Sequence, residues 1–167
     1  MRIRLEQTKD VPKIYAVNQG AFGSNTEASL VDALRGRASE VVSLVAEVGG
    51  DVVGHIMFSP VQLAGADAVR AMALAPMAVA PGHQRAGVGS ALVRAGLEEC
   101  RRLGVDAVFV VGHPSYYPRF GFRRASGVGM ACEFDVPDDA FMVIELVAGA
   151  LSGRRATVHF HPAFREE

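Results

Sequence analysis

The amino-acid sequence predicts one mixed α/β domain, with a central twisted sheet and flanking helices. Its 167 residues suit a single domain, and half of them are apolar. Residues 41–63 have the pattern of a β-hairpin, and residues 71–111 that of a strand, a helix and a second strand. A hairpin pairs its strands antiparallel, whereas a strand–helix–strand crossover pairs them parallel. The predicted sheet is therefore mixed.

The N-terminal part predicts a short strand and two helices. Residues 1–6 alternate charged and apolar side chains, which is typical of a strand. From Thr8, apolar residues recur at helical spacing until a polar break at residues 23–26. A second short apolar face over residues 30–34 predicts another helix.

The hairpin and the strand after it are predicted by β-branched residues. Residues 41–48 and 52–63 flank a Gly-Gly-Asp turn, which is a strong hairpin signal. A further apolar run at residues 71–79 precedes a Pro-Gly pair. We expect these three runs to be strands.

After Gly87 the apolar residues follow the helical period, and Gly104 ends that helix as a left-handed cap. Residues 105–111 are almost wholly apolar, as expected of a strand that is buried on both faces. A last strand is predicted at residues 140–147. Because no clear period follows, we expect one domain over residues 1–167, with its core at about 1–147 and a C-terminal tail at about 148–167.

Charge and cysteine usage limit the partners. With 17 basic and 18 acidic residues, no overall field attracts the chain to nucleic acid or to a membrane surface. No apolar run is long enough to span a membrane, and the alternating N-terminus does not resemble a signal peptide. Cys100 and Cys132 lack metal-ligand spacing, and His159 and His161 lack a third ligand. We expect a cytoplasmic protein without a metal.

A glycine-rich turn, Gln84-x-x-Gly87-x-Gly89, connects a predicted strand to a predicted helix. The first turn of a helix has unpaired N–H groups that bind phosphate, and glycine lets an anion approach the backbone. Arg85 would add a cation and Ser90 a further donor. The turn lacks the third glycine of GxGxxG and the Gly-Lys-Ser/Thr of a P-loop. Tight packing of the helix on the sheet also explains the two glycines.

Two motifs carry a resemblance to a known family. The Gln84-x-x-Gly87-x-Gly89 turn resembles the Q/R-x-x-G-x-G/A motif of the GNAT superfamily of N-acetyltransferases. After the next strand, the Tyr-Pro-Arg-Phe-Gly-Phe segment that begins at Tyr117 resembles the family's Tyr-x-x-x-Gly-Phe. The similarity to the YhbS-like branch of predicted acetyltransferases extends over residues 53–60, 116–122 and 140–142. The resemblance implies a mostly antiparallel sheet that is splayed around the strand–helix–strand unit.

The resemblance also implies acetyl-CoA as cosubstrate. The pyrophosphate would lie on the backbone amides of the turn, and pantetheine would pair with the preceding strand, where one N–H would stabilise the oxyanion. Pro76, which has no N–H, would interrupt the ladder and help to open the pantetheine slot. The implied cofactor-binding residues are Met77, Ala78, Val79, Gln84, Arg85, Ala86, Gly87, Val88, Gly89 and Ser90.

Three catalytic candidates follow from the resemblance. Tyr117 matches the tyrosine that protonates the CoA thiolate in many members, although packing beneath the cofactor also explains it. The base that deprotonates the amine has two candidates: Glu27, in the region that lines the acceptor site, and His113, at the end of the strand beside the cofactor. Glu27 as a charge at a helix start and His113 as a plain loop residue are equally open. His55 is interpreted as a core histidine and Tyr116 as structural.

The implied function is an acetyl-CoA-dependent N-acetyltransferase. It would move an acetyl group to a primary amine of a small molecule or a protein, by direct attack in a ternary complex. The alternative is a non-catalytic acyl-CoA-binding module or sensor. Tyr117 favours catalysis, whereas the lack of a glutamate in residues 71–79 favours the alternative. The sequence does not specify the acceptor, and a homodimer is one assembly that we consider.

Overall fold

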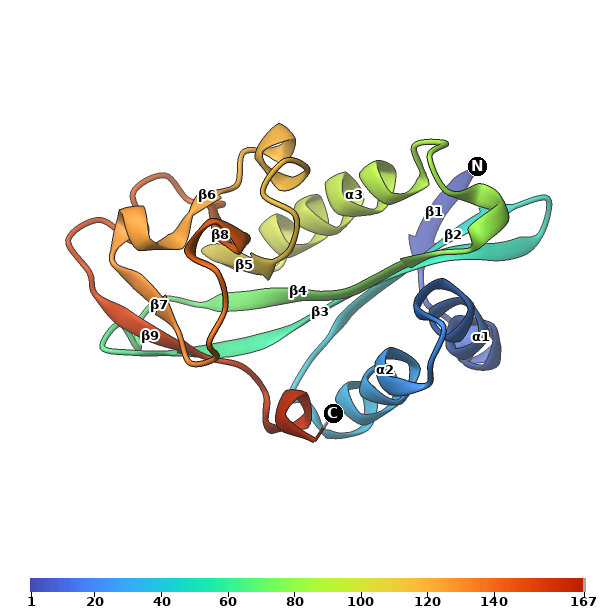
Figure 1. Cartoon of the computed structure of the whole chain (residues 1–167), viewed down its shortest axis with the longest axis horizontal. Helices are drawn as coiled ribbons and strands as arrows, with labels where there is room; N and C mark the ends of the chain where they lie inside the picture. The colour runs from blue at the N-terminus through green and yellow to red at the C-terminus, as the bar shows by residue number, and fades with distance from the viewer. Residues whose placement is uncertain (167) are drawn as a thin grey trace.

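The predicted mixed sheet forms the centre of the molecule, with helices on both of its faces (Figure 1). The computed structural model describes residues 1–166. Neighbouring strands of the main sheet are antiparallel except for β4 and β5, which are parallel. The strands run in the order β1 (Arg2–Leu5), β2 (Val42–Val48), β3 (Asp51–Ala64), β4 (Ala71–Val79), β5 (Ala107–Val111), β8 (Phe141–Glu145) and β6 (Arg123–Arg124).

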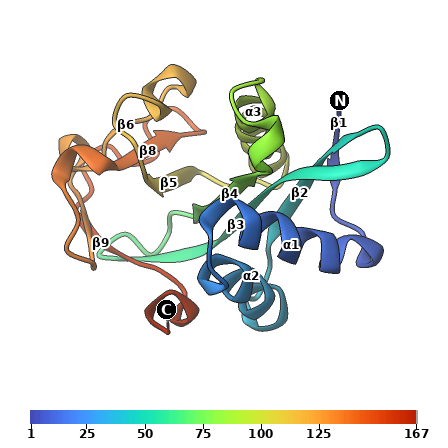
Figure 2. The ribbon, with the colours of Figure 1, turned by 45° about the vertical axis from the view of Figure 1, so that its right-hand side comes forward.

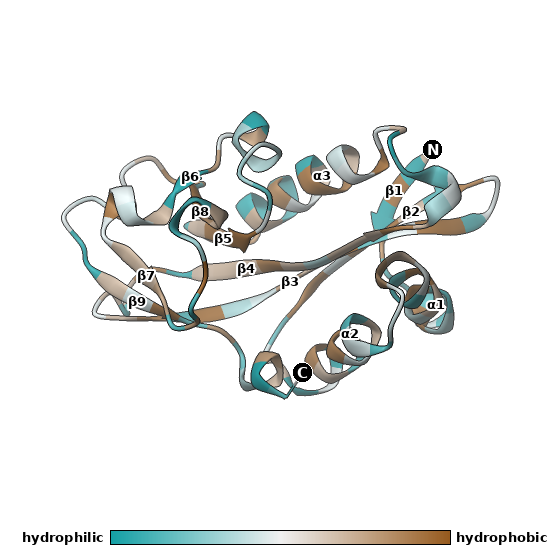
Figure 3. Ribbon diagram, viewed as in Figure 1, coloured by the Kyte–Doolittle hydropathy of each residue, from teal (hydrophilic) through white to brown (hydrophobic). Residues whose placement is uncertain are grey.

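Three α-helices cover the sheet. The helices α1 (Val11–Phe22) and α2 (Thr26–Arg37) lie on one face, and α3 (Val88–Arg102) lies on the other (Figure 2). The first pair packs against buried residues of β2 and β3, whereas α3 packs against the opposite side of the same strands. Strands β4 and β5, between the layers, are largely hydrophobic (Figure 3). The predicted helix from Thr8 begins as a 3-10 turn at Thr8–Asp10 before α1.

Strands β4 and β5 separate after three residues. Their pairing covers only Ala71–Ala73 of β4 and residues 107–109 of β5. Beyond Ala73, β4 stays paired with β3, and β5 stays paired with β8. The β3–β4 register shifts between Ile56 and Phe58, opposite Pro76, as expected of a residue without an N–H. The sheet therefore opens between β4 and β5, as the family resemblance implied.

The C-terminal segment contains a strand that the sequence did not predict. Strand β9 (Ala156–His159) pairs antiparallel with residues 62–64 of β3 and parallel with β7 (Met130–Cys132). A 3-10 turn, η6 (Pro162–Arg165), follows and contacts α2. Leu151 and Val158 are almost fully buried. Residues 151–160 thus contribute side chains to a core that was expected to end at about residue 147.

A buried chain of hydrogen bonds crosses the face that α1 and α2 cover. Asn18 Nδ2 donates to the carbonyl of Ile14 and to Nδ1 of His55, which lies 3.2 Å away. Nδ1 is therefore the acceptor, and Nε2–H donates to Ser43 Oγ at 3.0 Å. The Ser43 hydroxyl donates in turn to Glu6 at 2.6 Å. His55 is a fully buried core residue, as predicted, and burial lowers its pKa to about 3.

None of the helices within residues 1–166 combines the length and the apolar character needed to cross a lipid bilayer.

Candidate active site

The turn before α3 exposes backbone N–H groups. Gly87 is the N-cap of α3 with φ of +84°, and no side chain within residues 1–166 caps this end of the helix. Arg85 also has positive φ, +63°, which is uncommon for a residue other than glycine. Alternating left-handed residues turn successive N–H groups toward one concave side, which suits an anion. Residues 84–87 are all exposed, so an anion can reach them.

The side chain of Gln84 stabilises the turn to which it belongs. Its Nε2 donates to the carbonyl of Val79, the last residue of β4, at 3.0 Å. This bond returns the loop to the end of the strand. The side chain of Gln84 therefore fixes the shape of the turn and is already engaged, which distinguishes it from the residues whose N–H groups are free.

The open edge of β4 carries unpaired N–H groups at alternate residues. Ala80 N–H donates to Val53 on β3 at 2.8 Å, so it points toward β3. Successive N–H groups of a strand point to opposite edges, and residues 77–79 pair with β3 without a register shift. The N–H groups of Met77 and Val79 thus point into the opening, whereas that of Ala78 points toward β3. The Val79 carbonyl that Gln84 binds lies on the same open edge.

Tyr117 lies on the other side of the opening, in the turn after β5. The residue is 8% exposed, and its ring meets the ring of Phe122 edge-on, with centroids 5.6 Å apart. Its hydroxyl makes no hydrogen bond within residues 1–166. Burial raises the pKa of Tyr117 to about 12, so the phenol is protonated at neutral pH.

The two candidate bases lie on different elements. His113 is exposed in the turn after β5, and its backbone carbonyl accepts hydrogen bonds from the N–H groups of Tyr116 and Tyr117 at 3.1 and 3.4 Å. Glu27 lies half-buried in the first turn of α2. Within residues 1–166, no hydrogen bond or ion pair joins either side chain to Tyr117. Their roles as base stay predictions.

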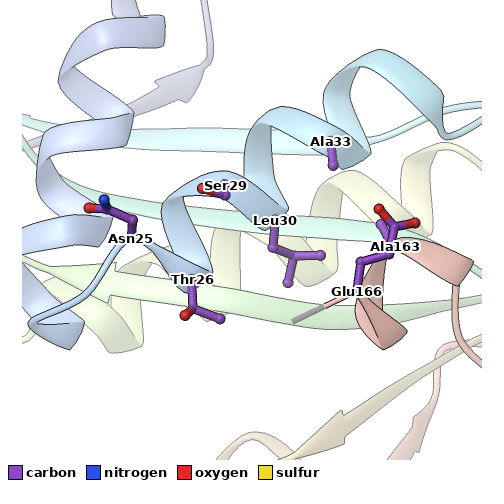
Figure 4. Close-up of a pocket in the computed structure, with 7 residues that line it drawn as sticks. All are labelled: Asn25, Thr26, Ser29, Leu30, Ala33, Ala163 and Glu166. Atoms are coloured by element: carbon purple, nitrogen blue, oxygen red, sulfur yellow. The ribbon is translucent and has the colours of Figure 1, made fainter.

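A hollow of about 370 Å³ lies between the start of α2 and η6 (Figure 4). Glu166, on its rim, pairs with Arg37 at 2.8 Å. Five of its lining residues belong to residues 6–37, a segment that the family resemblance predicts to line the acceptor site, and Glu27 does not line it. Its lining is Asn25, Thr26, Ser29, Leu30, Ala33, Ala163 and Glu166.

Sequence reasoning did not assign Tyr116 to the site. Its hydroxyl lies 3.1 Å from Ser90 Oγ in the first turn of α3. Position next to Tyr117 was the only signal in the sequence. The direction of the Tyr116 side chain depends on the 3-10 turn η3 (Tyr117–Phe120), which has no periodicity to read.

Neither a metal cluster nor a reactive thiol is found in the part of the chain that the structure describes. No group of three or more His, Cys, Asp or Glu side chains in residues 1–166 is arranged to hold a metal. Cys100 and Cys132 are free thiols. Burial raises the pKa of both, that of Cys100 to about 12, which keeps them protonated and unreactive.

Comparison with known proteins identifies the family. The model of the acetyltransferase (GNAT) domain matches residues 2–125. The uncharacterized N-acetyltransferase YhbS of Escherichia coli strain K12 is 36% identical over 165 residues, which cover 98% of each chain.

Two solved structures agree closely with the fold. Escherichia coli YhbS in complex with CoA has a TM-score of 0.91 at 35% identity, with 98% of this chain and 91% of that chain covered. A GNAT acetyltransferase from Brucella melitensis in complex with acetyl-CoA has a TM-score of 0.80 at 33% identity, with 98% and 97% covered. The expected fold and the expected cosubstrate are confirmed through these homologues. The chain belongs to the GNAT family of acetyltransferases, in agreement with its glycine-rich turn and its Tyr-x-x-x-Gly-Phe segment.

Proposed function

We propose that this GNAT acetyltransferase holds acetyl-CoA in the opening between β4 and β5 and passes the acetyl group to a primary amine in a ternary complex. The observation that carries the proposal is the open edge of β4. The outward N–H groups of Met77 and Val79 lead away from the exposed turn before α3, in a line that suits an extended pantetheine arm.

The turn would hold the phosphates. Backbone N–H groups of residues 85–90 supply donors, and the positive end of the α3 dipole favours the negative charge of a pyrophosphate. Arg85 is exposed and has no carboxylate within 4 Å among residues 1–166, so its charge is available to an incoming anion. Gln84 is assigned to the shape of the turn because its amide already binds Val79.

The order of residues along β4 orients the arm. Val79 lies next to the turn and Met77 two residues further into the opening. An arm that starts at the pyrophosphate meets the Val79 N–H first and brings its thioester to the Met77 N–H. We therefore assign the Met77 N–H to the thioester carbonyl, where it would stabilise the oxyanion as the amine attacks. Ala78, whose N–H points to β3, contributes packing only.

The acceptor must lose protons to react. An alkyl ammonium of pKa about 10 is only about 0.1% neutral at pH 7, so a base is needed. Glu27, in the first turn of α2, and His113, in the turn after β5, remain the candidates. The hollow beside α2 has hydroxyl, amide and carboxylate groups in its lining, which could contact the remote part of a polar acceptor.

Tyr117 would complete the reaction at sulfur. A thiol of pKa about 8.5 is a stronger acid than a phenol of pKa about 12. Full proton transfer from Tyr117 to the thiolate is thus uphill in the free protein. We assign to Tyr117 a hydrogen bond that stabilises the leaving sulfur as its negative charge develops. The proton that converts the CoA thiolate to the thiol then comes from Tyr117 or from solvent.

A non-catalytic acyl-CoA-binding module is the second candidate. It is favoured by one observation: β4 carries no carboxylate, so the base is absent from the strand where several family members have it. In that case the protein would bind acyl-CoA, but it would not bind and deprotonate an amine acceptor.

Two measurements test the proposal. Calorimetric titration with CoA is expected to give saturable binding. Acetyl-CoA is then presented with a panel of amines (polyamines, aminoglycosides, peptides with a free N-terminus or lysine), and released CoA thiol is detected. Amine-dependent thiol release with transfer of acetyl to nitrogen supports the enzyme. Binding without release on any amine supports the module, and no binding of CoA rejects both.

A further inference from the structure

A hydrogen bond between the hydroxyls of Tyr116 and Ser90 connects the two sides of the opened sheet. We call these sides the β4–α3 arm, residues 74–102, and the β5 arm, residues 107–122. Ser90 belongs to the first turn of α3, which follows β4, whereas Tyr116 belongs to the turn that follows β5. Their oxygens are 3.1 Å apart. The strands themselves are no longer paired at this level, because β4–β5 pairing ends at Ala73. The hydrogen bond therefore bridges the opening beside the turn that we assign to the pyrophosphate.

The ring of Tyr116 is held in place from behind. The Arg119 guanidinium carbon lies 4.4 Å from the ring centroid, a cation–π contact. Arg119 Nε also donates to the backbone carbonyl of Tyr116 at 2.9 Å. The rings of Tyr117 and Phe120 meet it edge-on, with centroids at 5.1 and 5.3 Å. These contacts fix both the backbone and the ring, so the position of the hydroxyl is set before any ligand arrives.

The hydroxyl of Tyr116 lies directly against the glycine turn. A Cβ added to Gly89 would stand 3.3 Å from Tyr116 Oη and 3.4 Å from Met77 Cε. A side chain at residue 89 would thus be in tight contact with the phenol. The phenol therefore lies beside Gly89 of the turn, close to the side chain of Met77 on β4. We expect the pyrophosphate to pass into pantetheine at this point.

We propose that Tyr116 and Ser90 form a hydroxyl clasp that binds the pyrophosphate of acetyl-CoA from both arms at once. The proposal rests on the proposed function. In the free protein one hydroxyl must donate to the other, so the pair has one O–H left to offer. When a phosphate binds, the hydrogen bond between the two hydroxyls is exchanged for two hydrogen bonds to phosphate oxygens, and hydrogen bonds to a charged acceptor are the stronger kind.

The clasp has a consequence for Tyr117, the next residue. Binding through Tyr116 ties the β5 arm to the β4–α3 arm, which fixes the backbone from which Tyr117 projects. Tyr116 is therefore a cofactor-binding residue that also positions Tyr117. If Tyr116 served packing alone, removal of its hydroxyl could lower the stability of the protein. It would not selectively lower the affinity for ligands that contain the pyrophosphate.

The experiment compares CoA binding in Tyr116→Phe and Ser90→Ala with the wild type by calorimetry. Each variant loses one donor to a charged group and is expected to raise the Kd for CoA about tenfold or more. The matched control is Tyr15→Phe on α1, which removes the hydroxyl of the third tyrosine and is expected to leave the Kd unchanged. Melting temperatures of all variants show whether each remains folded.

Shortened ligands locate the contact. Dephospho-CoA keeps the pyrophosphate, so Tyr116→Phe is expected to weaken it by the same factor as CoA. Pantetheine has no phosphate, and its binding, followed by NMR, is expected to be equal in the variant and the wild type. The clasp is rejected if either variant binds CoA as the wild type does, or if pantetheine shows the same loss. CoA that fails to bind the wild type rejects the proposed function and the clasp together.

Discussion

Gly112 lies against the ring of Tyr117, so that a Cβ at residue 112 would stand 2.4 Å from Tyr117 Cε2 and 3.0 Å from Cδ2. The glycine follows β5 directly, at the point where the sheet has opened. Its N–H still donates to the carbonyl of Ala140 at 2.9 Å. The buried position of the phenol therefore depends on the absence of a side chain at residue 112.

Gly112→Ala is expected to displace Tyr117 and to lower kcat. The ring cannot move away freely because it is buried against Phe122, and overpacking of this kind costs about 1–3 kcal/mol. The measurement is kcat at saturating acetyl-CoA with an amine from the acceptor screen, together with thermal melting. A variant with wild-type kcat and melting temperature would show that the ring has room that the structure does not give it.

Tyr117→Phe is expected to lower kcat about tenfold to a hundredfold and to leave CoA binding unchanged. Because burial raises the pKa of Tyr117 to about 12, its deprotonation should not reduce the rate in the range accessible to assay, below about pH 10. The check is a pH profile of kcat for the wild type and the variant. An alkaline limb near pH 10 that only the variant lacks would contradict the buried environment.

His55 is expected to make folding stability depend on pH between about 6.5 and 3. Its folded pKa, about 3, is below the unfolded value of about 6.5. The unfolded chain therefore binds the extra proton, and this part of the stability is complete above pH 6.5 and falls by about 1.4 kcal/mol per pH unit below it. The lowered carboxylate pKa values of Glu6 and Asp10 add to the pH dependence only below about pH 5, so the contribution of His55 stands alone above that pH.

The check is denaturant unfolding of the wild type and of His55→Gln at several pH values. The variant should be less stable at pH 7.5, because it disturbs the bonds to Asn18 and Ser43, and the difference should narrow as the pH falls. A His55 imidazole that titrates near 6.5 by NMR would refute the prediction.

Truncation after residue 147 is expected to unfold the chain. It removes Leu151, Val158 and Phe160, which are 1%, 0% and 6% exposed. Burial of each such side chain contributes about 1.5–3 kcal/mol, against a total stability of about 5–15 kcal/mol. The measurement is circular dichroism with thermal melting. Removal of residues 166 and 167 alone is the control and should cost under about 1 kcal/mol, because the Arg37–Glu166 pair is exposed. If a fragment of residues 1–147 folds cooperatively, the prediction is wrong, and the essential core ends at about residue 147 as the sequence suggested.

The sequence predicted the elements that have a strong local pattern. The period of α3, the Gly-Gly turn between β2 and β3, and the apolar runs of β4 and β5 all correspond to elements of the structure. Strands β6, β7 and β9 were missed because they have two, three and four residues and pair with residues far away in the chain. Their stability comes from the partner strand, which a local pattern does not contain.

The motifs of the site were predictable from the sequence, whereas the directions in which its N–H groups and side chains point were not. Spacing located the turn from Gln84 to Ser90 and singled out Tyr117. The hydrogen bond from the Ala80 N–H to the Val53 carbonyl determines which N–H groups of β4 point into the opening. The meeting of Tyr116 with Ser90 depends on a 3-10 turn and on the angle between two separated arms. Neither is encoded in residues that are neighbours in the sequence.

Arg85 shows how stability and affinity oppose each other in this chain. Among residues 1–166 it is the non-glycine residue with positive φ, a conformation that costs roughly 1–2 kcal/mol and that glycine adopts freely. Selection for thermal stability alone would favour Arg85→Gly, and the resulting protein would lack the cation beside the turn. A more heat-resistant version of this protein obtained in that way is expected to be the poorer acetyltransferase.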